Sequence, residues 1–380
     1  MTCRQPKATI WRWILLWFIV SYLVLCLWLF FAYVRPSFLG GNSLRIGADS
    51  AVYLAITEVV PNDTIRLAQS PLVSIGGNFL GPIAIAKLIP SIFGIAILNL
   101  AFFLICLCIA DSLPGVQLGA FFWAIVLNPL TTPSLLTLNK EILSFLSVML
   151  LMLYISREPR SRVLLICVLL TAIMARWEQA LVTVLFLLVE HRKSPFRGRP
   201  RLVLALMVVG ITVIYPLAFN AGLEGLMSLL VVSARGNFMP TLNEIQAHYG
   251  FPLIFAPKII LNLWGEVLRP TYFFTDYLKN DFSDIQNSFA IPFHCVAMFV
   301  VSLVALFKKK LSLQKAPIYW SAIYLLATAA TPVFQPRYQF AVYAVLCLEI
   351  SGFNSPLVST AKRTVKLPAL RHRIIRSASA

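Results

Sequence analysis

The stretch GADSAVYLAI at residues 47–56 places a carboxylate, Asp49, four residues before an aromatic side chain, Tyr53. On a helix that begins near Asp49, the two side chains lie one turn apart and can face the same cavity. A carboxylate there can take the proton of an incoming hydroxyl or bind a metal ion. A purely structural role is the alternative, with Asp49 or Ser50 as helix cap and Tyr53 as an interfacial aromatic. We predict that Asp49 is catalytic and that Tyr53 contacts the substrate.

Two further motifs place charges at the ends of apolar runs. In TLNKEILSF, Lys140 and Glu141 begin a predicted helix, where Lys140 can pair with phosphate and Glu141 lies at the positive helix end. In ARWEQA, Arg176 and Glu178 separate two short apolar stretches. An interfacial anchor and a structural ion pair are the plain alternatives. Because ionisable groups in such surroundings are costly and usually functional, we predict all four as substrate-binding residues.

The motif TPVFQPRYQFAVY supplies a further cation. Arg337 is the only charged residue between Lys315 and Glu349, and two prolines flank the turn that holds it. A planar guanidinium suits an oxygen-rich anion such as pyrophosphate, although it can also anchor a lipid headgroup. We predict that Arg337 and the adjacent Tyr338 bind substrate.

These motifs are positioned by the apolar runs that they flank. Hydrophobic residues form 59% and charged residues 12% of the 380-residue chain, whose mean hydropathy is +0.81. Since soluble domains carry about 25% charged residues, we predict an all-α, polytopic membrane helical bundle that forms one domain over residues 1–380. Runs near the ~20 residues that cross a bilayer predict about ten spans. The predicted spans are 11–34, 82–110, 116–134, 139–156, 162–175, 177–190, 202–220, 288–307, 317–333 and 337–353.

The pair 162–175 and 177–190 is short for two full crossings, so a hairpin of half-helices is an alternative there. Basic residues gather in alternate connections, which the positive-inside rule assigns to the cytoplasm together with both termini. That side holds 21 of the 32 basic and 4 of the 15 acidic residues, and so carries the whole net charge of +17. This excess charge, including the basic cytoplasmic tail 354–380, fits anionic membrane lipids and requires no nucleic acid.

Two segments on the opposite, extracytoplasmic side are long, namely 35–81 after the first span and 221–287. Their amphipathic stretches and aromatic residues predict short helices that lie along the membrane, including one at 252–268. All the candidate site residues fall on this side, so we expect any acid or base chemistry to take place there.

The combined pattern resembles a known class of proteins. GADSAVY in the first external loop, NKEILSFLSVMLLMLY, ARWEQALVTVLFLL and PRYQFAVYAVL together are similar to the membrane glycosyltransferases of the GT-C fold class and related bacterial polysaccharide-assembly proteins, including polymerases. The resemblance covers most of the chain in layout and rests on short motifs. It implies transfer of a sugar or oligosaccharide from a polyprenyl phosphate or diphosphate to a saccharide or lipid acceptor, in cell-surface polysaccharide or glycolipid synthesis at the bacterial inner membrane.

The same resemblance implies roles for particular residues. Asp49 matches the first-loop acid that activates the acceptor, and the phosphate is expected on Lys140, Arg176 and Arg337. The chain departs from the class in two ways. Many members carry two neighbouring acids in the first loop, whereas the next acid after Asp49 here is Glu58. Many members also carry a soluble C-terminal domain, which we do not expect in this chain. A divalent metal therefore remains open, and no other cofactor is implied. The alternatives are a flippase for lipid-linked oligosaccharides and a non-catalytic component of a polysaccharide assembly complex.

Overall fold

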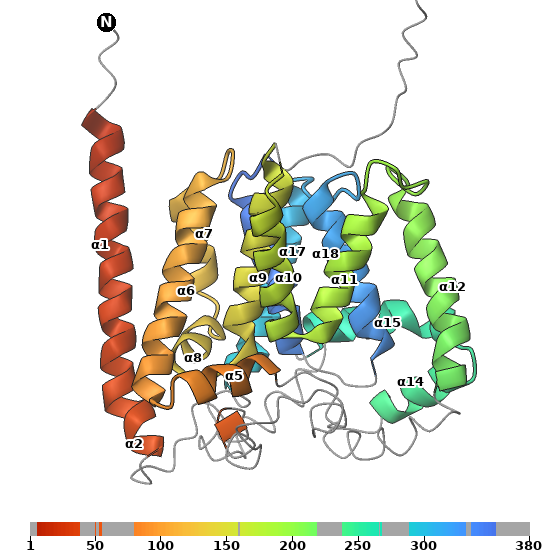
Figure 1. Cartoon of the computed structure of the whole chain (residues 1–380), viewed down its shortest axis with the longest axis horizontal. Helices are drawn as coiled ribbons and strands as arrows, with labels where there is room; N and C mark the ends of the chain where they lie inside the picture. The colour runs from red at the N-terminus through yellow and green to blue at the C-terminus, as the bar shows by residue number, and fades with distance from the viewer. Residues whose placement is uncertain are drawn as a thin grey trace, which may run out of the picture.

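The computed structural model describes residues 6–38, 50, 53–54, 80–158, 160–218, 238–265, 267, 289–331 and 336–354. These residues form helices arranged side by side and contain no strand (Figure 1), so the predicted all-α class is confirmed. In chain order the helices are α1 (Pro6–Leu29), the π-helix η1 (Phe30–Val34), α2 (Arg35–Phe38), α5 (Leu80–Leu88), α6 (Ile92–Ser112), α7 (Leu118–Val126), α8 (Thr131–Leu136), α9 (Lys140–Ser156), α10 (Arg162–Ala175), α11 (Trp177–Val189), α12 (Pro200–Ala218), α14 (Phe238–Ala247), α15 (Phe251–Trp264), α17 (Ile291–Phe307), α18 (Ala316–Ala330), the 3-10 helix η4 (Pro336–Gln339) and α19 (Phe340–Ile350).

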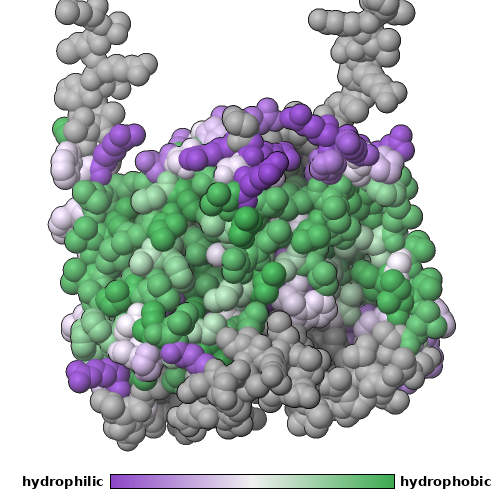
Figure 2. Space-filling view, viewed as in Figure 1, coloured by the Kyte–Doolittle hydropathy of each residue, from purple (hydrophilic) through white to green (hydrophobic). Residues whose placement is uncertain are grey.

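Three stretches of helix are long and apolar enough to cross a membrane, namely Ile10–Ser37, Ile92–Ser112 and Pro200–Leu217. The expected count of about ten spans is not confirmed, because the other apolar helices in the described residues are shorter. Figure 2 shows a broad hydrophobic band below a hydrophilic edge. We call this edge the basic rim; it contains residues 157, 158, 160–162, 191–199 and 308–315. The opposite end of the bundle, where α9 begins, is called the site end.

Two of the predicted spans are each divided into two helices. The run 82–110 forms α5 and α6, separated at Pro90, and Ser91 caps α6 by accepting the N–H of Gly94 at 3.3 Å. The run 116–134 forms α7 and α8, which are separated around Asn128 and Pro129. A proline lacks the N–H that a continuous helix requires, and hydrophobicity alone does not register this loss. Neither of these two runs therefore forms one continuous helix.

The remaining runs agree closely with the predicted boundaries. The run 139–156 forms α9, and 162–175 and 177–190 form α10 and α11, which separate at the single residue Arg176. Helix α15 covers most of the predicted segment 252–268. The run 337–353 begins as the 3-10 helix η4 and continues as α19, so Arg337 lies before the regular helix and not within it.

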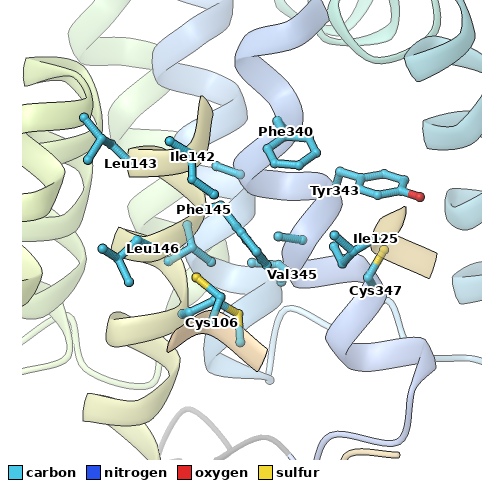
Figure 3. Packing of buried hydrophobic residues seen from close by; sticks show 14 of the residues in the cluster. Cys106, Ile125, Ile142, Leu143, Phe145, Leu146, Phe340, Tyr343, Val345 and Cys347 are labelled. Atoms are coloured by element: carbon cyan, nitrogen blue, oxygen red, sulfur yellow. The ribbon is translucent and has the colours of Figure 1, made fainter. Parts of the chain in front are cut away.

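A dry aromatic core lies between α9 and α19 (Figure 3). The Phe145 ring packs against Phe121 at 6.2 Å and Phe340 at 5.9 Å between ring centroids. The Tyr343 hydroxyl donates to the Ala124 carbonyl oxygen at 2.6 Å, which ties α19 to α7. A closely packed interior resists displacement of its side chains. The start of α9 and η4 lie next to these core residues in the sequence, and their positions are therefore well defined.

Candidate functional site

The start of α9 is fixed by hydrogen bonds from three directions. Asn139 is extended, and its side-chain oxygen accepts the N–H of Lys140 at 2.8 Å, which caps the helix. The Asn99 amide donates to the Thr137 carbonyl at 2.8 Å, and the Ser50 hydroxyl donates to the Leu138 carbonyl at 2.9 Å. Lys140 and Glu141 therefore follow a backbone that α6 and the first loop both hold.

Arg176 lies at a break between two helices. Its backbone is extended, with φ −163° and ψ 136°, so α10 ends before it and α11 begins after it. Its N–H still donates to the Ala172 carbonyl at 2.8 Å, and its own carbonyl accepts the N–H of Ala180 at 3.1 Å. Arg176 is thus the single non-helical residue between α10 and α11, and it carries a long cationic side chain.

Gly81 allows α5 to lie against this break. A Cβ atom at Gly81 would stand 2.0 Å from the carbonyl oxygen of Met174 and 2.9 Å from Leu143. Real side chains do not make such contacts, so only glycine permits α5 to approach the end of α10 this closely. The site end is consequently covered by α5 beside Arg176.

The ionisable side chains from three elements meet at the site end. The Arg176 Nη2 atom donates to Glu141 Oε1 at 3.0 Å, and Arg337 Nε lies 3.9 Å from the same oxygen. The exposed fractions are 2% for Arg176, 1% for Glu141 and 7% for Arg337. Burying such groups is expensive unless charge and hydrogen bonds compensate it. The buried carboxylate of Glu141 therefore lies between two guanidinium groups.

The ring of Tyr338 is the common surface for these cations. The guanidinium carbon of Arg176 lies 3.5 Å from the ring centroid, that of Arg337 lies 5.8 Å away, and Lys140 Nζ lies 5.7 Å away. Lys140 Nζ also lies 5.7 Å from the ring of Tyr53. Cations over aromatic faces gain more attraction when they are desolvated. We call Lys140, Glu141, Arg176, Arg337 and Tyr338 the charged cluster.

The charged cluster and the neighbouring Gln179 contain polar atoms that no described residue satisfies. Arg176 Nε and Nη1, Glu141 Oε2 and Gln179 Oε1 are buried without a hydrogen-bond partner in the part of the chain that the structure describes. An unpaired buried donor or acceptor costs about 1–3 kcal/mol, and more when it is charged. Donors and acceptors left open side by side suit a ligand that carries both an oxyanion and hydroxyl groups.

The structure brings together six of the eight residues predicted for the site, namely Tyr53, Lys140, Glu141, Arg176, Arg337 and Tyr338. Glu178 lies in the first turn of α11, is partly exposed, and interacts electrostatically with Tyr324, as do Arg176 and Glu141. Asp49 lies outside the described residues. Its neighbours Ser50 and Tyr53 both contact the region where α9 begins.

Sequence reasoning missed the polar residues that support the charged cluster. Gln179 is fully buried and donates to the Ser144 carbonyl at 3.2 Å, which joins α11 to α9. The Tyr324 hydroxyl donates to the Tyr338 carbonyl at 3.0 Å. Asn99, in the run IAILNLAFF, is a polar residue in an otherwise apolar helix. An uncharged polar residue inside an apolar run is the signal in the sequence that marks such a support.

In the described residues, no group of three or more His, Cys, Asp or Glu side chains could hold a metal ion. The chain matches no protein-family model, no curated protein and no solved structure. The likeness to the GT-C class consequently remains a prediction.

Proposed function

We propose that the chain is a membrane glycosyltransferase or polymerase that takes a sugar or oligosaccharide from a polyprenyl phosphate or diphosphate carrier. The observation that carries this proposal is Arg176, which is 2% exposed, stacked on Tyr338, and has two nitrogen atoms without a partner among the described residues. A buried guanidinium with open donors is suited to bind phosphate oxygens.

The transfer itself needs a base and a stabilised leaving group. The acceptor oxygen forms a bond to the anomeric carbon, the bond from that carbon to the carrier phosphate breaks, and the phosphate keeps the electron pair. In our proposal Arg176, Arg337 and Lys140 stabilise the charge on the departing phosphate. The unpaired Glu141 Oε2 accepts a hydroxyl of the sugar.

Asp49 is the proposed base that takes the proton of the acceptor hydroxyl. The support is local: Ser50 donates to the Leu138 carbonyl at 2.9 Å, two residues before Lys140, and Tyr53 faces the Lys140 ammonium. The polyprenyl tail is assigned to the apolar helices, and acceptor recognition to residues 221–287.

The decisive experiment compares the two arginines at opposite ends of α10. The protein is purified in nanodiscs, and binding of a polyprenyl phosphate and transfer from a polyprenyl diphosphate sugar are both measured. Arg176→Met should lose at least about 100-fold in transfer, because a phosphate left without its charged hydrogen bonds loses about 1.5–3 kcal/mol for each bond. The matched control is Arg162→Met, which changes an exposed arginine at the first residue of α10 and should transfer normally.

Equal activity of the two variants would contradict the role of Arg176. Carrier translocation without any transfer would favour the flippase, and neither activity would favour the assembly component. Asp49→Asn should bind the carrier and lose transfer, and full transfer by this variant would remove Asp49 from catalysis.

The membrane arrangement belongs to the same proposal. We place about ten spans in a bacterial inner membrane, with shorter helices such as α10 and α11 packed within the bundle, and both termini in the cytoplasm. Single cysteines at Ser43 and Ser194 test this orientation. An impermeant thiol reagent added outside should label the first and not the second, and the reverse result would overturn it.

A further inference from the structure

Lys258 is a buried lysine outside the charged cluster. It lies in α15 with an exposed fraction of 1%, and its ammonium donates to the Asn243 side chain at 2.9 Å, the Gln246 side chain and the Thr331 carbonyl at 3.3 Å. A protonated amine has three donors, so these three oxygens use all of them. The hydrogen-bonded acceptors are neutral.

The acceptors belong to two other elements. Asn243 and Gln246 lie one turn apart on α14, and Thr331 follows the last residue of α18. The Gln246 amide also donates to the Ala330 carbonyl at 2.8 Å. The last carbonyls of a helix have no partner within it, and a cation there is favoured by the helix dipole. Lys258 thus ties α14 and α15 to the C-terminal end of α18.

The end of α18 is linked to the charged cluster in two ways. Thr331 lies five residues before Pro336, the first residue of η4. Helix η4 carries Arg337 and Tyr338, and α15 packs directly against it. The Gln339 amide in η4 donates to Thr328 Oγ1 at 3.1 Å on α18. A displacement of α15 or of the end of α18 would therefore move the element that carries Arg337.

We propose that Lys258 is a positioning residue that fixes η4, and through it Arg337 and Tyr338, for binding of the carrier phosphate. This step rests on the proposed function. Simple packing would be served better by an apolar side chain, because an ammonium costs several kcal/mol to bury. A lysine with directed bonds to α14 and α18 instead defines how three elements meet.

The first test needs no ligand. Hydrogen exchange is followed by mass spectrometry in nanodiscs for the wild type and Lys258→Met, whose side chain has similar length and no donor. In the variant, the amide hydrogens of η4 and α14 should exchange at least about 5-fold faster, because the tie between α15 and α18 is lost. The exchange of α9 should be unchanged. Lys193→Met, at an exposed lysine on the basic rim, is the control and should match the wild type.

The second test measures binding of a polyprenyl phosphate. Lys258→Met should bind about 3- to 10-fold more weakly. It should add nothing further in an Arg337→Gln background, because both changes act through the same element. A general loss of stability would weaken binding in both backgrounds, and additive effects would overturn the proposal.

The two tests separate this inference from the proposed function. Unchanged exchange at η4 in Lys258→Met overturns the role of Lys258 whatever the protein binds. Faster exchange in a protein that binds no polyprenyl phosphate overturns the proposed function and leaves the mechanical tie intact. If Lys258→Met does not fold, Asn243→Ala removes one acceptor, and the same pattern of exchange and binding is required of it.

Discussion

Two buried ionic groups lie at opposite ends of the bundle, and they are built differently. Near the basic rim, Lys315 Nζ lies 2.6 Å from Glu349 Oε2, and Glu349 is fully buried. We call Lys315 and Glu349 the closing pair, which consists of one cation and one anion. At the site end, Arg176 and Arg337 converge on a single oxygen of Glu141, and Lys140 shares the Tyr338 ring with them.

The closing pair and the charged cluster also differ in the backbone hydrogen bonds and unpaired polar atoms around them. Next to the closing pair, backbone bonds join the α6–α7 connection to the end of α19: the Gln117 N–H donates to the Ser351 carbonyl and the Asn354 N–H to the Pro114 carbonyl, both at 2.8 Å. No comparable backbone bonds cross the charged cluster in the described residues. Each group contains one buried carboxylate oxygen without a partner there, Oε1 of Glu349 and Oε2 of Glu141, but only the charged cluster also has open cationic donors, Nε and Nη1 of Arg176. A balanced pair with backbone support stabilises the fold, whereas converging cations with open donors are typical of binding sites.

After the loss expected for Arg176→Met, the largest effect is expected from removing the second guanidinium of the charged cluster. Arg337→Ala should reduce carrier use about 30-fold and Arg337→Lys about 5-fold, because lysine keeps the charge and loses the bidentate geometry. Transfer from a polyprenyl diphosphate sugar measures both. The control is Arg199→Ala on the basic rim, where the side chain is exposed. Equal losses in the two Arg337 variants would contradict bidentate phosphate binding.

A matched pair of carboxylate changes sharpens the comparison. Glu141→Gln should tighten binding of inorganic pyrophosphate about 5-fold, because it removes a negative charge beside two guanidinium groups. Glu349→Gln should leave pyrophosphate binding unchanged and lower the thermal unfolding temperature, because Lys315 loses its partner. Calorimetric titration and thermal unfolding in detergent distinguish the two. If both variants changed pyrophosphate binding and the unfolding temperature in the same way, the charged cluster and the closing pair would not differ in role.

A smaller effect is expected from the ring beneath Arg176. Tyr338→Leu should weaken binding of a polyprenyl phosphate about 3-fold, because a cation over an aromatic face is worth about 0.5–2 kcal/mol and orients the guanidinium. Tyr338→Phe keeps the ring and should bind normally. The Tyr338 hydroxyl would be the essential group if phenylalanine were as harmful as leucine.

The sequence predicted the helical class and all five residues of the charged cluster, because both depend on strong local signals. Apolar runs locate helices, and a charge that interrupts such a run, like Arg176 or Arg337, is expensive enough to indicate a site. A shared side of the membrane was expected for α9, the α10–α11 junction and η4, and in the structure Arg176 and Arg337 both approach Glu141.

The division of helices and the polar supports could not be predicted in the same way. Pro90 and Pro129 each divide a run that hydrophobicity treats as continuous. Gly81 matters because of the carbonyl of Met174, which is distant in sequence and adjacent only after folding. Lys258 lies in a predicted interfacial helix, where a lysine is common. Its role becomes visible only from its three acceptors, two on α14 and one at Thr331 after the end of α18.

The smallest effect concerns pH and Lys258, which lies outside the three stretches long enough to cross a membrane. Burial lowers the pKa of Lys258 from 10.5 to about 7. Since its pKa in the folded protein lies below that in the unfolded chain, the unfolded chain binds more protons between these values, and stability rises with pH above about 7. From pH 6.5 to pH 9, the thermal unfolding temperature of the wild type should rise relative to that of Lys258→Met by on the order of 2 °C. Lys193→Met should follow the wild type, and parallel curves for the wild type and Lys258→Met would show that the buried amine does not titrate there.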